Sequence, residues 1–231
     1  MVYAEPRPGV SQDLPPESSE AKARQALEKL LDATSRDEIA KVVHDPADTF
    51  LRYANTPVTA TPRKRILFDA SEKIPQSTQK YHLFRVVTDD VPLGFPVAIE
   101  DTDSGPRIDY SAFLQCRDQL LDKFMAEPSA TPGQFLVTLR RGHYFGNEIS
   151  QTGLDLLICF EIASPNPSSP RHIVFIPRSQ ELGKLALNKY SWDHLYTPVL
   201  ELSHKGNLVH VTNILGDTWQ KPRRPATKPA R

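Results

Sequence analysis

The fold is indicated most clearly by residues 154–163, which read LDLLICFEIA. β-Branched, aromatic and leucine side chains fill most of these positions, a composition that is typical of β-strands. In a strand, Asp155 and Glu161 fall on one face, and apolar side chains occupy positions on both faces. Because a strand that is apolar on both sides needs cover on both sides, we expect a sheet with helices on one face and a partner on the other.

Other segments with strand character lie on both sides of this run, and turn residues separate them. They are residues 81–87, 95–100, 135–145, 171–176, 195–203 and 208–215. Most of them follow one another in the second half of the chain, with a tight hairpin turn predicted at 205–207. This order favours an antiparallel sheet of sequential strands. Residues 57–79 stay ambiguous, because their one strand-like run, Arg65–Phe68, has polar flanks that contain proline.

Helical periodicity dominates the first part of the chain. Residues 20–54 contain three helix starts, including a capping box at 35–38 and an N-cap followed by proline at 45–46. A long helix is predicted to begin after Asp109 and to carry an apolar stripe as far as Phe124. Grouped helices and sequential strands indicate an α+β fold, in which N-terminal helices and one long helix pack on a strongly curved antiparallel sheet.

The chain has 231 residues, which is enough for one domain with tails. Residues 1–19 are rich in proline and polar side chains, and we expect them to form a flexible tail. Residues 220–231 are predicted to form a second tail, which is basic and rich in proline. Between the tails, we expect a single α+β domain over residues 20–219.

Composition and charge argue against several classes of protein. Because 28 Lys and Arg balance 28 Asp and Glu, the formal net charge is zero, which disfavours a body that coats nucleic acid. Two cysteines are too few for a disulfide scaffold or a four-cysteine zinc site. The sequence has no apolar run long enough for a membrane span, and its N-terminus does not resemble a secretory signal. We expect a cytoplasmic protein, with an anchored or exported form left open if an upstream segment is missing.

Three parts of the sequence resemble a known superfamily. They are ATSRDEIAKVVHDP at residues 33–46, PVAIED at 96–101 with RIDY at 107–110, and the strands from Phe135 onward. They resemble bacterial proteins of unassigned function in the nuclear-transport-factor-2-like (cystatin-like) superfamily. The resemblance implies a cone, in which helices pack into the concave face of a strongly bent antiparallel sheet. Because that superfamily includes isomerases, dehydratases, hydrolases and binding modules, the resemblance does not choose a function.

The densest polar run on a predicted strand is RRGHYF at residues 140–145. Alternation places Arg141 and His143 on one face of the strand, and Arg140 and Tyr144 on the other. In one interpretation the two arginines and Tyr144 bind a ligand, and His143 acts as a general base. In the other, which we favour, the run is the polar end of an edge strand, with solvated arginines and a hydrogen-bonded histidine.

Asp155 and Glu161 allow two interpretations of the same kind. A carboxylate opposite Arg140 or Arg141 would complete a cross-strand ion pair. In a pocket, the two carboxylates would instead be candidates for acid–base catalysis. The ion pair is the simpler interpretation, and it is the one that we favour.

The sequence predicts neither a metal site nor a cofactor. The seven histidines are scattered without the spacing of metal ligands, and there is no glycine-rich phosphate loop. Cys116 and Cys159 lie in apolar surroundings, and we expect them to be buried free thiols. Trp192 and Trp219 each stand near a predicted strand end, and we expect them to hold loops against the sheet.

These features favour a non-catalytic interaction or ligand-binding module with a small-molecule cavity, which forms a homodimer through its open sheet face. One alternative is a small-molecule enzyme of isomerase or hydrolase type that uses His143 with Asp155 or Glu161 in a cone cavity. A second alternative is an adaptor that binds an acidic partner through the basic tail at 220–231.

Overall fold

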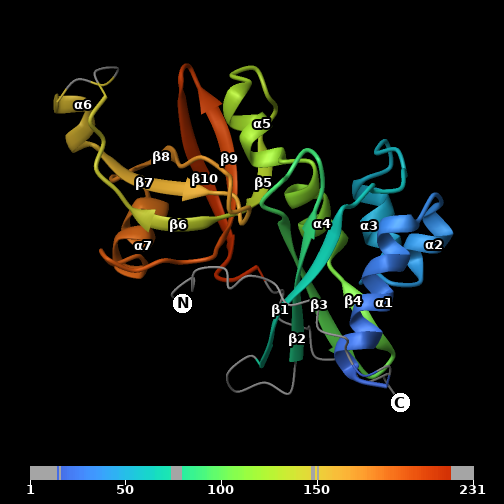
Figure 1. Cartoon of the computed structure of the whole chain (residues 1–231). Coiled ribbons are helices and arrows are strands. Elements are labelled where there is room, and N and C mark those ends of the chain that lie inside the picture. Colours follow the sequence, from blue (N-terminus) through green and yellow to red (C-terminus); the bar gives the residue numbers. More distant parts are fainter. Residues whose placement is uncertain (1–14, 16, 74–79, 147–148, 150, 220–231) are drawn as a thin grey trace, which may run out of the picture. The chain divides into compact units, whose positions relative to one another are not determined.

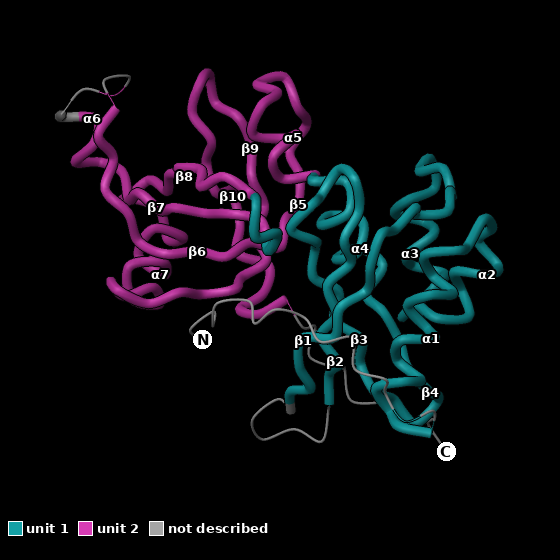
Figure 2. The backbone as a smooth tube through the Cα atoms, in the orientation of Figure 1, with its two compact units in different colours: residues 1–119, 165–168 teal, residues 120–164, 169–231 magenta. Residues whose placement is uncertain are grey.

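Figure 1 shows the computed structural model of the chain, which describes residues 15, 17–73, 80–146, 149 and 151–219. These residues form two compact units, each with its own hydrophobic core (Figure 2). Unit 1 is Met1–Gln119 with Pro165–Ser168, and unit 2 is Leu120–Ser164 with Ser169–Arg231. The sequence predicts one domain with one core over residues 20–219, whereas the described part of that range contains two cores.

The two predicted tails fall largely outside the described part of the chain. Residues 1–14, residue 16 and residues 220–231 are not among the described residues. The tail predictions for those residues therefore stay predictions. Ser18 and Ser19 are described, and they belong to the start of the first helix rather than to the predicted tail.

Unit 1 begins with the helices that the sequence predicts. They are α1 (Ser19–Asp32), α2 (Arg36–Ala40) and α3 (Pro46–Arg52), with α4 (Tyr110–Arg117) later in the chain. The Ser18 side chain caps α1 by accepting from Ala21 N–H, and Ser35 forms the predicted capping box with Glu38 at α2. Asp45 precedes α3 with a left-handed φ of 43° and makes no side-chain capping bond. The apolar stripe predicted for the first helix is buried in α1.

Unit 1 also contains an antiparallel sheet of four strands in sequential order. They are β1 (Arg65–Lys73), β2 (Lys80–Val87), β3 (Phe95–Thr102) and β4 (Gly105–Ile108). The apolar stripe of α1 belongs to the same core as Phe84 and Ile99 of the sheet. The ambiguous stretch 57–79 thus provides a full strand, β1, while residues 74–79 lie outside the described residues.

Unit 2 contains a mixed sheet of six strands in the order β5-β9-β10-β8-β7-β6. The strands are β5 (Gly133–Leu136), β6 (Thr138–Arg141), β7 (Leu157–Ala163), β8 (His172–Pro177), β9 (Val199–Lys205) and β10 (Leu208–Gly216). Neighbouring strands are antiparallel except β10 and β8, which are parallel. The helices of this unit are α5 (Leu120–Ala126), α6 (Gln151–Asp155) and α7 (Glu181–Lys189). The hairpin turn predicted at 205–207 is confirmed, with Gly206 at φ 61°.

The predicted long helix after Asp109 is interrupted, so that α4 and α5 replace it. Asp109 caps α4 as predicted, by accepting from the Ala112 N–H at 3.0 Å. Between the two helices Gln119 has a φ of 51°, a left-handed conformation that ends a right-handed helix. Phe113 of α4 belongs to the core of unit 1, and Phe124 of α5 to the core of unit 2. The stripe appears continuous in the sequence because neither glycine nor proline marks the break.

The α+β class is confirmed, but the single strongly curved sheet is corrected to two separate sheets. The reason lies in strand pairing, which hydrophobic periodicity does not reveal. Strand β2 pairs with β1 and β3, its neighbours in the sequence, so the sheet of unit 1 is built without any strand from the second half of the chain. The cone implied by the nuclear-transport-factor-2-like resemblance is therefore not confirmed.

Two of the differences between the predicted and the observed strands change the position of candidate site residues. The strand predicted over 135–145 is divided into β5 and β6, which lie at opposite edges of the six-stranded sheet. Residues 142–146 follow β6 without regular secondary structure, so His143 leaves the sheet. The strand predicted over 154–163 begins only at Leu157, because Asp155 belongs to α6.

Candidate functional site

The candidate site lies on the face of the six-stranded sheet opposite the core of unit 2. Ile158 and Phe160 of β7 belong to that core, so the alternation of the strand directs Leu157 and Cys159 to the opposite face. Phe175 of β8 pairs in register with Cys159 and lies on the same face, where it is nevertheless buried. Other side chains must therefore cover this second face of the sheet.

Residues 142–146 supply part of that cover. The rings of Tyr144 and Phe175 meet edge-on, with centroids 5.2 Å apart and planes at 78°. The exposed His143 stacks on Trp192, with centroids 4.7 Å apart and planes at 21°. Trp192 is 43% exposed, so it contributes an open aromatic surface in addition to any role in holding its loop.

A cavity of about 230 Å³ is lined by this segment and by the sheet. Its apolar wall includes Leu154, Leu157 and Phe175. Arg141 and Arg178 supply its positive charge, and no Asp or Glu of the described residues lines it. The cavity therefore combines two guanidinium groups with apolar and aromatic surface, which is the usual composition of a small-ligand site.

Neither of these arginines has a carboxylate partner among the described residues. The Arg141 guanidinium carbon lies 4.6 Å from the centroid of the Trp192 ring, and the Arg141 Nε is buried without a described hydrogen-bond acceptor. The Arg178 Nε donates to the carbonyl oxygen of Leu157 at 2.9 Å, which fixes the direction of its side chain. Two guanidinium groups without a carboxylate partner favour an anion as the missing partner.

Arg140 and Glu161 form a cross-strand ion pair outside the cavity. The two residues are directly opposite in the register of β6 and β7. The Glu161 Oε2 lies 2.6 Å from Arg140 Nη2 and 3.4 Å from Arg171 Nη1. Neither Arg140 nor Glu161 lines the cavity. The geometry therefore matches the ion-pair interpretation of these two residues.

Asp155 and His143 are not brought together as an acid–base pair by the contacts of the described residues. Asp155 is exposed in α6, and the predicted sharing of one strand face with Glu161 is wrong because β7 begins two residues after Asp155. His143 makes its ring contacts with Phe145 and Trp192. The cavity lining includes His143 but neither of the two carboxylates. Of the sequence candidates, the cavity thus gathers Arg141, His143 and Tyr144.

Cys159 lines the cavity, but its thiol is protonated at neutral pH. Cys159 is half-buried rather than fully buried as predicted, and its burial together with the neighbouring charge of Glu161 raises its pKa to about 11. Burial likewise raises the pKa of Cys116, which is buried as predicted, to about 12. Because the thiolate is the nucleophilic form, neither cysteine is suited to nucleophilic catalysis.

The described residues contain no group of three or more His, Cys, Asp or Glu side chains arranged to hold a metal ion. Among the helices of the described residues, none combines the length and the apolar composition that crossing a bilayer requires.

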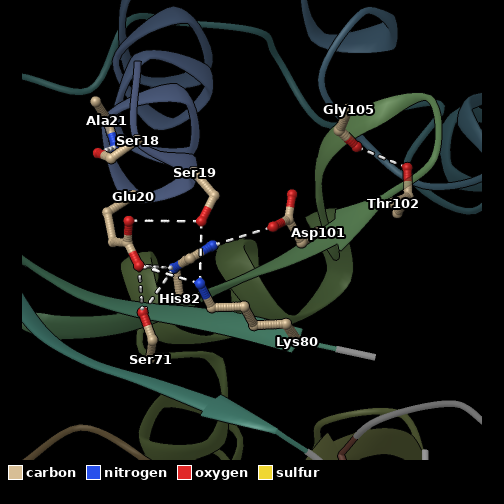
Figure 3. A network of polar contacts seen from close by, with 10 residues as sticks. All are labelled: Ser18, Ser19, Glu20, Ala21, Ser71, Lys80, His82, Asp101, Thr102 and Gly105. Carbon is tan, nitrogen blue, oxygen red and sulfur yellow. Dashed lines mark hydrogen bonds and ion pairs between the residues drawn. The ribbon is translucent and has the colours of Figure 1, made fainter. Parts of the chain in front are cut away.

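A second group of polar side chains, which the sequence did not single out, lies in unit 1 (Figure 3). His82 of β2 is fully buried, with its Nδ1 2.8 Å from Ser71 Oγ and its Nε2 3.5 Å from Asp101 Oδ2. Glu20 of α1 accepts from Ser71 Oγ at 3.2 Å and from Lys80 Nζ at 3.1 Å. A histidine on the apolar face of a predicted strand is the one sequence signal that points to this network.

The contacts from Ser71 to His82 and from His82 to Asp101 resemble those of a serine-hydrolase triad. In such a triad the serine hydroxyl donates to the histidine, and the Ser71 hydroxyl does not. Glu20 is ionised, because its own backbone N–H and Lys80 lower its pKa to about 2, so it can only accept. Ser71 therefore donates to Glu20 and accepts from His82 Nδ1, which leaves His82 unable to take the Ser71 proton. Neither described cavity touches these residues. We interpret the network as an anchor between the start of α1 and the sheet of unit 1.

Comparisons with protein-family models, with curated proteins and with solved structures find no match to this chain. The functional argument therefore rests on the geometry of the described residues.

Proposed function

We propose that the chain is a non-catalytic ligand-binding module, and that the cavity of unit 2 binds a small anion with an apolar body. The observation that carries the proposal is the presence of Arg141 and Arg178 in one cavity lining, without a carboxylate partner among the described residues. Arg140 provides the contrast, because it is adjacent to Arg141 in the sequence and is paired with Glu161.

The chemistry of the cavity supports a ligand of this kind. A hydrogen bond between a guanidinium and an anionic oxygen contributes about 1.5–3 kcal/mol. The ring of Trp192, which is 43% exposed, offers surface on which a planar apolar body gains further free energy by burial. At about 230 Å³ the cavity suits a compact ligand, on the scale of one aromatic ring that carries an acid group.

A binding role has more support than catalysis. The Cys159 thiol is protonated, and His143 is exposed and stacked on a ring rather than paired with a carboxylate. The enzyme alternative needs His143 to converge with Asp155 or Glu161, and the described contacts supply no such convergence. The adaptor alternative depends on residues 220–231, which lie outside the described residues, so it stays a prediction.

Isothermal titration calorimetry with benzoate tests the proposal. Arg141→Gln is expected to weaken benzoate binding at least tenfold, because one charge-assisted contact is lost. Arg140→Gln is the matched control, since it removes the same charge from the adjacent residue outside the cavity, and it is expected to leave benzoate affinity unchanged. Equal effects of the two substitutions, or no benzoate binding by the wild-type chain, would refute the proposal.

The homodimer predicted from the sequence remains part of this proposal. Phe145 is 89% exposed and Leu156 is 66% exposed, and both belong to unit 2. Exposed apolar side chains of this size favour association with another surface, and a second copy of the chain would supply one. The nuclear-transport-factor-2-like resemblance is compatible with such a module, and it stays a proposal about ancestry.

A further inference from the structure

A second cavity, of about 410 Å³, adjoins the first within unit 2. The two cavities share Tyr144 and Phe175 as lining residues. The rings of these residues are in edge-on contact, with centroids 5.2 Å apart. One aromatic pair thus forms a wall of both cavities.

The two cavities differ in chemistry. The first contains Arg141 and Arg178, whereas no Lys, Arg, Asp or Glu of the described residues lines the second. Apolar side chains line part of the second cavity, with Met125, Ile173 and Leu208 among them, and Asn207 and His204 add uncharged or weakly basic polar groups. A cationic space therefore lies next to a space that is lined partly by apolar side chains and by no Lys, Arg, Asp or Glu of the described residues, and one aromatic pair lines both.

We propose that the two cavities form one elongated site for an amphipathic anion. The acid group lies at Arg141 and Arg178, and a hydrocarbon chain passes the Tyr144–Phe175 pair into the second cavity. This inference rests on the proposed function, since both use the same cationic end. It adds the class of ligand, which is a carboxylic acid with an unbranched aliphatic chain.

Size and local structure support this ligand class. Pockets for organic ligands commonly measure about 300–1,000 Å³. The first cavity is smaller than this range, the second falls within it by itself, and the two together also stay within it. Phe175 belongs to β8, and Tyr144 lies in residues 142–146, which have no regular secondary structure.

The test is calorimetry on the full chain with butanoate, hexanoate, octanoate and decanoate. Complete burial of a methylene group strengthens binding about fourfold. Allowing for incomplete burial, we expect affinity to rise at each step and by about 100-fold from butanoate to decanoate. Arg141→Gln is expected to weaken binding of every member of the series about tenfold.

Two leucine substitutions distinguish a loss of affinity caused by the second cavity from a nonspecific effect of replacing a leucine. Leu208→Ser, in the second cavity, is expected to weaken decanoate binding at least fivefold, about the effect of one or two buried methylenes, and to leave benzoate binding unchanged. Leu185→Ser, on an exposed site of α7 outside both cavities, is the matched control and is expected to change neither affinity.

The outcomes distinguish this inference from the proposed function. Affinities that do not depend on chain length, with benzoate binding still dependent on Arg141, would overturn the elongated site and leave the anion site intact. Affinities that rise with chain length but do not respond to Arg141→Gln would overturn both, because the hydrocarbon would then bind without the cationic end. Equal effects of Leu208→Ser and Leu185→Ser on decanoate would also overturn the elongated site.

Discussion

Two adjacent arginines in unit 2 show how the surroundings of a residue decide its role. Arg140 meets Glu161 on the neighbouring strand, whereas Arg141 meets Trp192 and lines the cavity. Alternation along the strand predicts that the two arginines face opposite ways. Trp192 contacts Arg141 although the two residues are far apart in the sequence, and local periodicity does not predict such a contact. Trp219 does hold its segment in place, because its indole N–H donates to the carbonyl oxygen of Val137 at 2.9 Å.

Glu20 is expected to make the stability of the fold sensitive to acid. Its pKa is lowered from 4.5 to about 2, chiefly by a hydrogen bond from its own backbone N–H and by Lys80. Because the pKa is lower in the folded chain, the stabilisation is fully present above about pH 4.5 and is lost as the pH falls through 2. We expect the free energy of unfolding, measured with urea, to fall as the pH is lowered from 4.5 to 2. The fall should be about 2 kcal/mol larger for the wild-type chain than for Glu20→Gln.

The control for this measurement is Glu28→Gln, which changes an exposed carboxylate of the same helix that pairs with Arg24 one turn away. It should keep the acid sensitivity of the wild-type chain. If Glu20→Gln and the wild-type chain lose stability in parallel on acidification, the network in Figure 3 does not anchor α1 as described.

The elements themselves show what can be read from a sequence and what cannot. Helix starts are local, and the caps at Ser35 and Asp109 are where the sequence predicts them. The break at Gln119 carries no local signal, since helical periodicity continues across it and the two helices enter different cores. Strand pairing depends on partners that are distant in the sequence, so the two sheets could not be predicted from periodicity.

The left-handed conformation of Gln119 leads to a prediction about stability. A non-glycine residue at a φ of 51° is strained by about 1 kcal/mol relative to glycine. Gln119→Gly is therefore expected to raise the free energy of unfolding by roughly 0.5–1 kcal/mol in urea titrations. Ala112→Gly, inside α4, should instead lower it by about 1 kcal/mol. Destabilisation by both substitutions would mean that the chain does not need a left-handed residue at 119.

At the scale of the whole molecule, the described residues contain two cores, and the candidate chemistry is divided between them. Unit 1 holds the buried network around His82, which we interpret as structural. Unit 2 holds both described cavities and the two arginines, Arg141 and Arg178, that have no carboxylate partner among the described residues. Arg141, His143 and Tyr144 of the polar run at 140–145 line the first cavity, and the alternative acid–base roles of His143 and Asp155 have no support from the contacts of the described residues.

Self-association is the prediction that concerns the whole molecule. Light scattering at micromolar concentration is expected to give the mass of a dimer for the wild-type chain. Phe145→Ser should shift the equilibrium toward the monomer, because it removes the most exposed large apolar side chain of the described residues. Leu51→Ser, which removes an exposed leucine from unit 1, is the control and should leave the dimer intact. A strict monomer in the wild-type chain would contradict the prediction.

The central claim is that an anion binds beside Arg141 and Trp192, and the two tryptophans of the chain provide a direct test of it. The measurement is the pair of indole N–H signals in ¹H–¹⁵N NMR spectra during a titration with benzoate. We predict that the Trp192 signal shifts and saturates while the Trp219 signal stays in place, and that Arg141→Gln raises the benzoate concentration required about tenfold. A Trp192 signal that does not move, or equal shifts of both signals, would contradict the account.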